Sequence, residues 1–229
     1  CWNTTGNPTL ENSHTENGTG TGSFNSNITG LSLGTTYFVK AYAVNSTGTA
    51  YGNEYFFTTL NIPTITTDAV SLVTGISATC GGNISYNGGA VVTERGLCWN
   101  TTGNPVITDS HVTAGEGTGI FSSEMTGLTI GTVYYARAYA TNVIGTAYGN
   151  TQSFTTQNFA SVTTNAVTSI TYTTAQGGGN IASDGGALIT QRGVCWNTTG
   201  NPVISGNHTS DGSGAGIYTS NITGLAVNN

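Results

Sequence analysis

Short runs in which apolar and polar residues alternate recur along the chain and predict an all-β protein. The clearest run occurs twice, and one face of it carries Tyr37, Val39, Ala41 and Ala43, then Tyr134, Ala136, Ala138 and Ala140. An earlier run repeats a large, small, large pattern in Phe24, Ser26, Ile28, then Phe121, Ser123, Met125, then Tyr218, Ser220, Ile222. Since side chains alternate across a strand, one face of each run must be buried.

Turn residues divide residues 60–156 into short strands. The expected strands are an edge at Pro63–Thr67 and then residues 77–84, 91–99, 119–128, 133–142 and 148–156, with a long polar loop between the third and the fourth. No stretch sustains a 3.6-residue period. Short strands between Gly, Asn and Asp turns are typical of a β-sandwich. In the third strand Cys98 and Trp99 must point to opposite faces, and the pattern allows either of them to face inward.

The octapeptide CWNTTGNP begins at Cys1, Cys98 and Cys195, which sets a repeat of 97 residues. Aligning residues 1–59 with 98–156 gives 35 identities in 59 positions, including polar loop positions that no core requires. A repeat as long as a small domain can bury its own core, unlike the short units of a solenoid. We therefore expect tandem immunoglobulin-like or fibronectin III-like β-sandwich modules.

The period divides the chain into three parts. Residues 1–59 form a partial repeat without its leading strands, residues 60–156 a complete repeat, and residues 157–229 a partial repeat without its trailing strands. Either the sequence is a window on a longer chain, or strand exchange between chains completes the end repeats. The junctions TTLNIPTITT and TTQNFASVTT leave little slack between neighbours.

Two segments carry a resemblance to a known family. GLTIGTVYYARAYATN and its twin GLSLGTTYFVKAYAVN resemble the fibronectin type III stretch in which a Leu, a tight turn and a Tyr precede a core strand. The resemblance implies that Leu31 with Tyr37, and Leu128 with Tyr134, form that family's tyrosine corner.

The resemblance extends over essentially the whole chain. The unit from GGNI through RGLCW, NTTGNP and GTAYGN to FTT is similar to repeats in large secreted and surface, adhesin-like proteins of Bacteroidota-type bacteria. The usual turn proline of fibronectin type III domains is replaced by Leu33 and Ile130. The resemblance implies an extracellular or cell-surface location.

The charge composition argues against a nucleic-acid partner. The chain has 4 basic and 10 acidic residues and a formal net charge of −6. Four basic residues cannot build the phosphate-neutralising patch on which nucleic-acid affinity depends. Surfaces rich in uncharged Thr, Asn and Gly repel one another weakly, so copies of the protein could instead bundle into fibres.

The internal copies test candidate chemistry, because a site needed in every repeat should recur at intervals of 97. No carboxylate has an acidic counterpart in another copy, which argues against paired-carboxylate hydrolysis and against a repeated calcium site. His14, His111 and His208 do recur, but no second His or Cys lies at zinc-ligand spacing beside them. We expect these histidines to pack in loops or to make a pH-sensitive contact between repeats. We expect no catalytic residue, no metal site and no cofactor.

The cysteines allow two interpretations. Cys98 could form a disulfide with Cys80 across neighbouring strands, although the counterpart of Cys80 in the next copy is Gly177. Alternatively, the recurring Cys1, Cys98 and Cys195 are small buried apolar residues, as free cysteines often are.

A strip of aromatic and cationic residues lies on the second face of the alternating strand. It consists of Phe38, Lys40, Tyr42, Tyr135, Arg137 and Tyr139. Cross-strand packing would explain it, and a contact with a glycan or a neighbouring chain would also use such residues. Lys40 is the only lysine and has Arg137 as its twin, so lysine-based isopeptide cross-links cannot recur in every repeat.

These observations predict a structural role. We expect a stalk or filament of an extracellular or cell-surface protein that supports adhesion or assembly, with neighbouring repeats and other copies of the chain as partners. The alternative is a carbohydrate-binding or spacer module of a secreted polysaccharide-degrading enzyme, with a surface glycan as partner.

Overall fold

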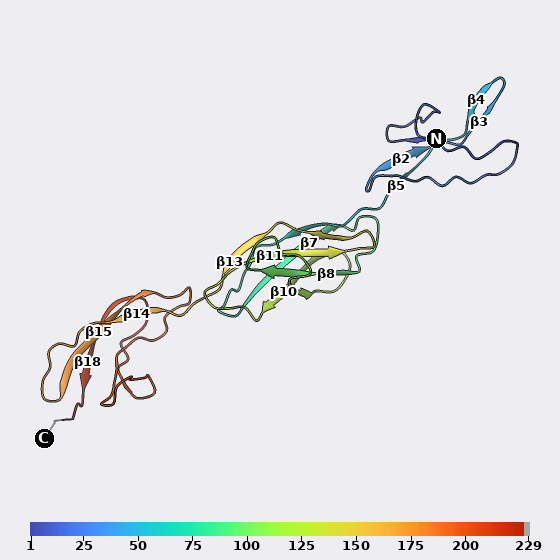
Figure 1. Ribbon diagram of the computed structural model, residues 1–229. Coiled ribbons are helices and arrows are strands. Elements are labelled where there is room, and N and C mark those ends of the chain that lie inside the picture. Colours follow the sequence, from blue (N-terminus) through green and yellow to red (C-terminus); the bar gives the residue numbers. More distant parts are fainter. Residues whose placement is uncertain (227–229) are drawn as a thin grey trace.

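The computed structural model describes residues 1–226, which form 18 β-strands and no helix. Every strand pair is antiparallel. The strands gather into three groups that follow one another along a line, in the order of the sequence (Figure 1). The fold class is therefore all-β, as the alternation predicted.

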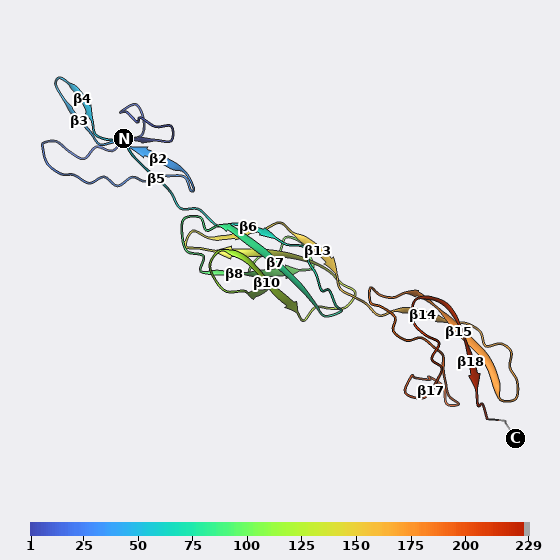
Figure 2. The same cartoon turned by 180° about the vertical axis from the view of Figure 1, so that it is seen from behind.

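The first sheet of the middle repeat has the order β10-β7-β6. Its strands are β6 (Thr64–Thr67), β7 (Ser77–Tyr86) and β10 (Gly119–Thr126). β7 is the central strand, and Phe121 of β10 lies opposite Gly82 while Met125 lies opposite Ala78. Figure 2 shows these three strands from behind.

The second sheet of the middle repeat has the order β12-β11-β8-β9, and β13 also pairs with β11. Its strands are β8 (Glu94–Asn100), β9 (Ser110–Thr113), β11 (Val133–Thr141), β12 (Thr146–Tyr148) and β13 (Gln152–Thr155). Two antiparallel sheets of three and five strands, with a tyrosine at the start of the central strand β11, make this repeat a fibronectin III-like β-sandwich.

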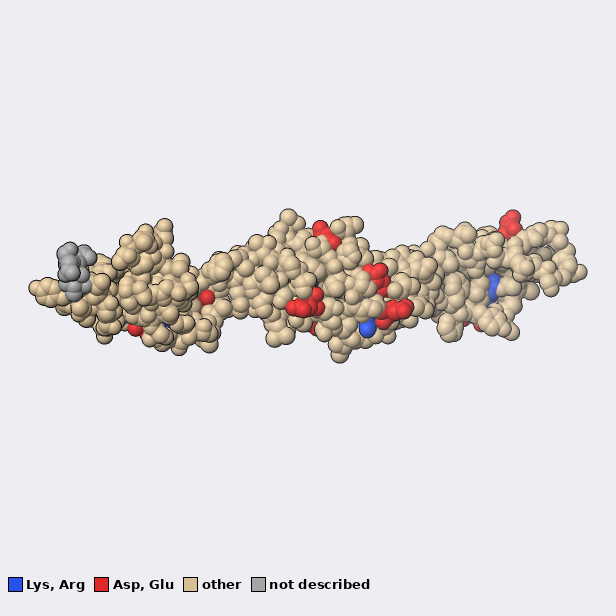
Figure 3. Space-filling model, turned by 90° about the horizontal axis from the view of Figure 1, so that it is seen from below, with Lys and Arg blue, Asp and Glu red and all other residues tan. Residues whose placement is uncertain are grey.

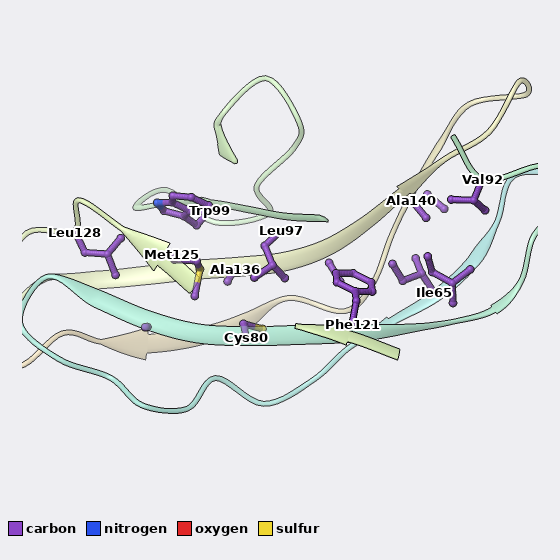
Figure 4. Close-up of a cluster of buried hydrophobic side chains, with 14 residues drawn as sticks. Ile65, Cys80, Val92, Leu97, Trp99, Phe121, Met125, Leu128, Ala136 and Ala140 are labelled. Carbon is purple, nitrogen blue, oxygen red and sulfur yellow. The ribbon is translucent and has the colours of Figure 1, made fainter. Parts of the chain in front are cut away.

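The core of the middle repeat lies between the two sheets (Figure 4). The alternation predicted for β11 is confirmed, since Ala136, Ala138 and Ala140 are all 0% exposed. Leu97 and Trp99 belong to the same core cluster, whereas Cys98 does not. Trp99 is therefore the residue of this strand that faces inward.

The strand pattern differs from the sequence-based expectation in two places. The polar loop after residue 99 contains β9, which pairs with β8 and places His111 opposite Cys98. The last expected strand, residues 148–156, is two strands, because the chain turns between β12 and β13 and both pair with β11. The largely polar sequence concealed β9, in which only Val112 packs against the core.

The first repeat contains five strands. They are β1 (Trp2–Asn3), β2 (Thr36–Val39), β3 (Tyr42–Asn45), β4 (Gly48–Tyr51) and β5 (Tyr55–Thr58). The segment around Phe24 and Ile28, whose counterpart in the middle repeat is β10, is not a strand. In the middle repeat that strand bonds to β7, and residues 1–59 contain no counterpart of β7 to pair with it.

The third repeat also contains five strands. They are β14 (Ser161–Thr164), β15 (Thr174–Ser183), β16 (Cys195–Trp196), β17 (Asn207–His208) and β18 (Gly216–Thr223). Its β14-β15-β18 sheet matches the first sheet of the middle repeat. β16 has two residues where β8 has seven, because β8 is held along its length by β11 and residues 157–226 contain no such partner.

Candidate functional site: the junctions between repeats

One asparagine in each linker is bonded to the repeat that follows. The backbone N–H of Asn61 donates to the carbonyl of Gly88 at 2.8 Å, and that of Asn158 donates to the carbonyl of Gly185 at 2.7 Å. Each asparagine Oδ1 also accepts the N–H of the next residue, at 2.9 and 2.8 Å. The two linkers therefore adopt the same local geometry, 97 residues apart.

The residue before each asparagine is bonded to the preceding repeat. The N–H of Gly34 donates to the carbonyl of Leu60 at 3.1 Å, and the N–H of Gly131 donates to that of Gln157 at 3.0 Å. Both glycines lie in the loop that leads into the central strand of their repeat. Of two consecutive linker residues, the first is thus bonded to the preceding repeat and the second to the following repeat. The linker has no unbonded residue at this point that could act as a hinge.

A threonine fixes the end of the last strand before each linker. The Oγ1 of Thr156 donates to the carbonyl of Thr129 at 2.6 Å and accepts the N–H of Thr132 at 2.9 Å. Thr59 makes the same two bonds, at 2.6 and 2.9 Å. Thr156 is 3% exposed, so these bonds are shielded from water.

Glycine is required where the following repeat contacts the linker. A Cβ on Gly88 would lie 2.0 Å from the carbonyl oxygen of Asn61, and a Cβ on Gly185 would lie 2.1 Å from that of Asn158. Both glycines also have positive φ, at +74° and +69°. The approach is between backbone atoms, which cannot rotate away as a side chain could.

The preceding repeat packs on the side chain of the same asparagine. A Cβ on Gly34 would lie 2.5 Å from Nδ2 of Asn61, and a Cβ on Gly131 would lie at the same distance from Nδ2 of Asn158. We call each set of one linker asparagine and its two flanking glycines a junction clamp; the sets are Gly34, Asn61 and Gly88, and Gly131, Asn158 and Gly185.

Asn142 reinforces the first junction clamp from the loop between β11 and β12. Its Nδ2 donates to the carbonyl of Asn61 at 2.7 Å and to that of Asn87 at 2.9 Å. The side chain is only 4% exposed. One buried amide thus ties the linker to two loops of the middle repeat.

The octapeptide folds into a closed loop in all three copies. The Nδ2 of Asn3, Asn100 and Asn197 donates to the carbonyl of the glycine three residues later, at 3.0, 3.3 and 2.9 Å, and Oδ1 accepts the N–H of that glycine. Asn104 follows the glycine with φ of +45°, and its two counterparts adopt the same conformation. These requirements explain why both asparagines and the glycine of NTTGN recur unchanged.

The cysteines of the octapeptide help to close this loop. Their Sγ atoms lie 3.4 to 3.5 Å from the carbonyl oxygen of the proline seven residues later, in Cys1, Cys98 and Cys195 alike. Burial raises the pKa of the Cys98 thiol to about 12, which makes it unreactive.

The disulfide considered between Cys80 and Cys98 is not formed, and both cysteines are free. Cys80 faces the core between the sheets, and its Sγ lies 3.4 Å from the carbonyl of Asp68. Cys98 points away from that core, since its neighbours Leu97 and Trp99 point into it. The two thiols belong to different faces and hydrogen-bond to different segments, so the alternative of buried free cysteines describes them. Burial raises the pKa of Cys80 to about 11.

Each tyrosine assigned to a tyrosine corner bonds to the backbone upstream of it. The hydroxyl of Tyr134 accepts the N–H of Thr129 at 3.1 Å, and that of Tyr37 accepts the N–H of Ser32 at 3.0 Å. The donor is in both cases the residue after the leucine, Leu128 or Leu31. Leu128 is 4% exposed and Leu31 is partly buried.

The aromatic and cationic strip is not a continuous exposed surface in the middle repeat. Tyr139 is 0% exposed, packs edge-on against His111 and donates its hydroxyl to Oε1 of Glu94 at 2.6 Å. Arg137 lies over the ring of Tyr148 at 4.8 Å and donates from Nε to a backbone carbonyl. Tyr139 lies on the face opposite the core, as the alternation predicted, but its ring packs over Gly96 of β8 and against His111 of β9, so it is not available as an exposed contact.

The strip is more open in the first repeat. Phe38 lies against Phe56 of β5, with ring centroids 6.2 Å apart, and Phe56 is 73% exposed. Lys40 donates from Nζ to Oδ1 of Asn7 at 3.1 Å, and Tyr42 donates its hydroxyl to the carbonyl of Thr15. The partly buried Tyr135 occupies the position of Phe38 in the middle repeat, where Ser153 replaces Phe56.

The recurring histidines have one loop contact in common. Nδ1 of His14, His111 and His208 lies 3.0, 3.1 and 2.9 Å from the carbonyl oxygen two residues earlier. Within residues 1–226, no group of three or more His, Cys, Asp or Glu side chains is arranged to hold a metal ion. The same residues include no helix long and apolar enough to cross a membrane.

The junction clamps were missed by the sequence-based reasoning, although a signal was present. The linkers read LNI and QNF, so Asn61 and Asn158 are identical between neighbours that differ. Gly88 and Gly185 likewise recur in turns. What the sequence does not reveal is that Asn61 contacts Gly88 at one junction and Asn158 contacts Gly185 at the other.

Comparisons with known proteins give structural likenesses only. No protein-family model matches the chain, and no curated protein matches it. The sensor domain of the anti-sigma factor RsgI4 in Pseudobacteroides cellulosolvens is similar at 18% identity and a TM-score of 0.33, over 42% of this chain and 95% of that chain.

Two multidomain structures are also similar. Domains of titin match at 18% identity and a TM-score of 0.33, over 55% of this chain and 41% of that chain. The FN1–FN3 domains of chicken CNTN1 match at 11% identity and a TM-score of 0.31, over 86% of this chain and 70% of that chain.

Proposed function

We propose that this chain is part of a semi-rigid rod of β-sandwich repeats, which forms the stalk or filament of an extracellular or cell-surface protein and supports adhesion or assembly. The observation that carries the proposal is the recurrence of the junction clamp. Independent domains on flexible linkers have no need for matching linker contacts, whereas a rod needs the same contact at every joint.

The surface of the chain suits this role. Charged residues are scattered over the repeats, and most of the face in Figure 3 carries none. Such a surface can pack against other copies through polar contacts with little repulsion. The proposed role is mechanical and non-catalytic, with neighbouring repeats and other copies of the chain as partners.

A glycan-binding or spacer role in a secreted enzyme is less well supported by the geometry. Sugar rings stack on exposed aromatic faces, and Tyr139 is buried against His111 in the complete repeat. The other aromatic residues of the strip, Phe38, Tyr42 and Tyr135, are only partly exposed, so no repeat presents an open aromatic platform on this strip.

Small-angle X-ray scattering of residues 1–229 tests the rod. We expect a pair-distance distribution with one maximum at the thickness of a repeat and a long tail that reaches the full length of three repeats in a line. A distribution that fits only an ensemble of bent and compact forms would contradict a rod. The surface location is tested separately, by whether antibodies against the repeats label intact cells of the source organism.

A further inference from the structure

Two side chains of the first repeat converge on Asn7 in the octapeptide loop. Nζ of Lys40 donates to Oδ1 of Asn7 at 3.1 Å. The backbone N–H of Asn7 donates to Oε2 of Glu54. The asparagine therefore has an amine at its carboxamide and a carboxylate at its backbone. These are the groups from which an amide bond between two side chains can be made.

The amine and the carboxylate distinguish this repeat from the middle one. The middle repeat keeps the asparagine, as Asn104, but Arg137 takes the place of the lysine and Thr151 that of the glutamate. A guanidinium stays protonated and cannot act as a nucleophile, whereas a lysine amine can lose its proton and attack a carbonyl carbon. Two differences between the repeats thus meet at one asparagine, and together they supply an amine and a proton acceptor.

In the complete middle repeat the corresponding positions are also close together. Oγ1 of Thr151 donates to Oδ1 of Asn104 at 3.0 Å. A side chain at the position of Glu54 can therefore reach the carboxamide oxygen itself. Glu54 and Thr151 each stand just before the last strand of their repeat, β5 or β13, so the approach is part of the repeat architecture.

A cysteine holds the octapeptide loop against the end of β2, where the lysine follows. Sγ of Cys1 lies 3.5 Å from the carbonyl oxygens of Pro8 and Lys40. In the middle repeat Sγ of Cys98 makes the same two contacts, at 3.4 Å from Pro105 and 3.6 Å from the counterpart of Lys40. The loop and the strand are thus held together in the same way in both repeats, and the reacting side chains approach each other from a fixed frame.

We propose that Lys40 and Asn7 form an intramolecular amide cross-link, with Glu54 as the group that transfers protons. Cγ of Asn7 is bonded directly to Oδ1, so the lysine nitrogen lies near the separation of roughly 3–3.5 Å from which an attack proceeds. Lys40 is partly buried, which restricts the space in which its amine moves. The repeat therefore brings the amine and the carboxamide together before any bond forms.

The reaction exchanges one amide nitrogen for another. The ammonium group of Lys40 passes one proton to the carboxylate of Glu54, and the neutral Nζ attacks Cγ of Asn7. The Nζ–Cγ bond forms and the Cγ–Nδ2 bond breaks. A second proton from Nζ and the proton held by Glu54 both go to the departing nitrogen, which leaves as ammonium. Glu54 is a carboxylate again at the end, and no oxidant or other reactant is consumed.

The cross-link closes the segment between Asn7 and Lys40, which are 33 positions apart. A pull on the ends of the repeat cannot then lengthen this segment. A covalent link also limits the freedom of the unfolded chain, as a disulfide does, so it should stabilise the folded repeat. The inference goes beyond the proposed rod and does not rest on it, because it concerns one bond inside one repeat.

Intact-mass spectrometry of residues 1–229 tests the bond. After incubation at alkaline pH, where more of the lysine amine is neutral, we expect the mass to fall by one molecule of ammonia. The Lys40→Arg variant, which carries the residue of the middle repeat, should keep its full mass. This control also separates the cross-link from ring closure at an Asn-Gly pair, which releases ammonia without any need for the lysine.

Trypsin locates the bond, because Lys40 is the only lysine and the next basic residue is Arg95. Trypsin does not cut after a lysine whose amine is part of an amide. The denatured, cross-linked chain should therefore give one peptide that ends at Arg95, whereas an unlinked chain should also be cut after Lys40. Glu54→Gln can still accept the N–H of Asn7 but cannot take up a proton, so it should slow formation of the uncut peptide by roughly 100-fold.

A gain of function separates the reaction from the folding of the first repeat. Arg137→Lys combined with Thr151→Glu places the same groups around Asn104 in the complete repeat. This double variant should lose a second ammonia and resist trypsin at position 137, whereas either substitution alone should not. A wild-type chain that keeps its full mass and is cut after Lys40 would overturn the proposal, and so would a double variant that gains no second bond. Neither result would affect the rod, which scattering tests separately.

Discussion

The junction clamp makes its sharpest prediction at Gly88. Alanine at this position would place a Cβ 2.0 Å from the carbonyl oxygen of Asn61, and ordinary contact begins at 3.4 Å. The linker backbone must therefore retreat by more than 1 Å. Gly127→Ala is a matched control, because Gly127 has a similar φ of +70° and a Cβ added there would have no atom within 4 Å.

The magnitude follows from the bonds that this retreat breaks. The Asn61 oxygen accepts from Asn142 at 2.7 Å, and the Asn61 N–H donates to Gly88 at 2.8 Å. Each bond contributes about 0.5–1.5 kcal/mol, so Gly88→Ala should weaken the junction by about 1–3 kcal/mol. Both variants also bear a backbone cost of about 1–2 kcal/mol for alanine at positive φ, which the comparison removes.

Residual dipolar couplings of backbone amides in a weakly aligning medium measure the outcome. In the wild type and in Gly127→Ala, one alignment tensor should fit residues 1–59 and 60–156 together. In Gly88→Ala the two parts should need separate tensors, with smaller couplings in the first. If one tensor still fits Gly88→Ala, the clamp does not fix the orientation of the repeats. If Gly127→Ala also needs two tensors, strain and not contact is the cause.

Three further predictions concern the middle repeat. Tyr134→Phe removes the acceptor for the Thr129 N–H and should lower the free energy of unfolding by about 1 kcal/mol in urea, whereas Tyr135→Phe should change it less. Cys98 should resist alkylation at pH 8 until the chain is unfolded, as measured by mass spectrometry, because burial raises its pKa to about 12; rapid native-state labelling would contradict this. Burial, together with the hydrogen bond to Glu94, raises the pKa of Tyr139 to about 12 from an unfolded value near 10. The unfolded chain then releases this proton first, so stability should fall between pH 10 and 12, and urea unfolding of Tyr139→Phe should show a smaller fall.

The sequence predicts most of the sandwich because its strands follow a simple period. The alanines of β11 and the pair Phe121 and Met125 alternate as a half-buried strand must, and they do form the core. β9 escaped prediction because its residues SHVT carry no such alternation and it is recruited by pairing with β8. Local pattern identifies a strand that buries its own face, but not one that is held by its neighbour.

The candidate site was harder to predict, because its contacts join residues far apart in the sequence. Asn142 reaches the linker at Asn61 across 81 positions, and neither residue stands out by type. Tyr139 gives a second example: alternation placed it opposite the core, but could not show that its ring is buried over Gly96 and against His111. The internal repeat helps to find such contacts. A residue that stays identical between copies while its neighbours change marks a position where the copies share the same local geometry.

The two linkers differ in the residues beside the asparagine but keep the asparagine itself. This indicates that the repeats share the geometry of the junction, and not only the presence of a junction. Leu60 becomes Gln157 and Ile62 becomes Phe159, so the surroundings of the asparagine are free to vary. The asparagine itself is confined between two glycines, which have no side chain that could rotate to adjust the angle between repeats. In the proposed rod, joints with matching contacts should apply a similar rotation each time, and lateral contacts along the rod should then recur at a fixed spacing.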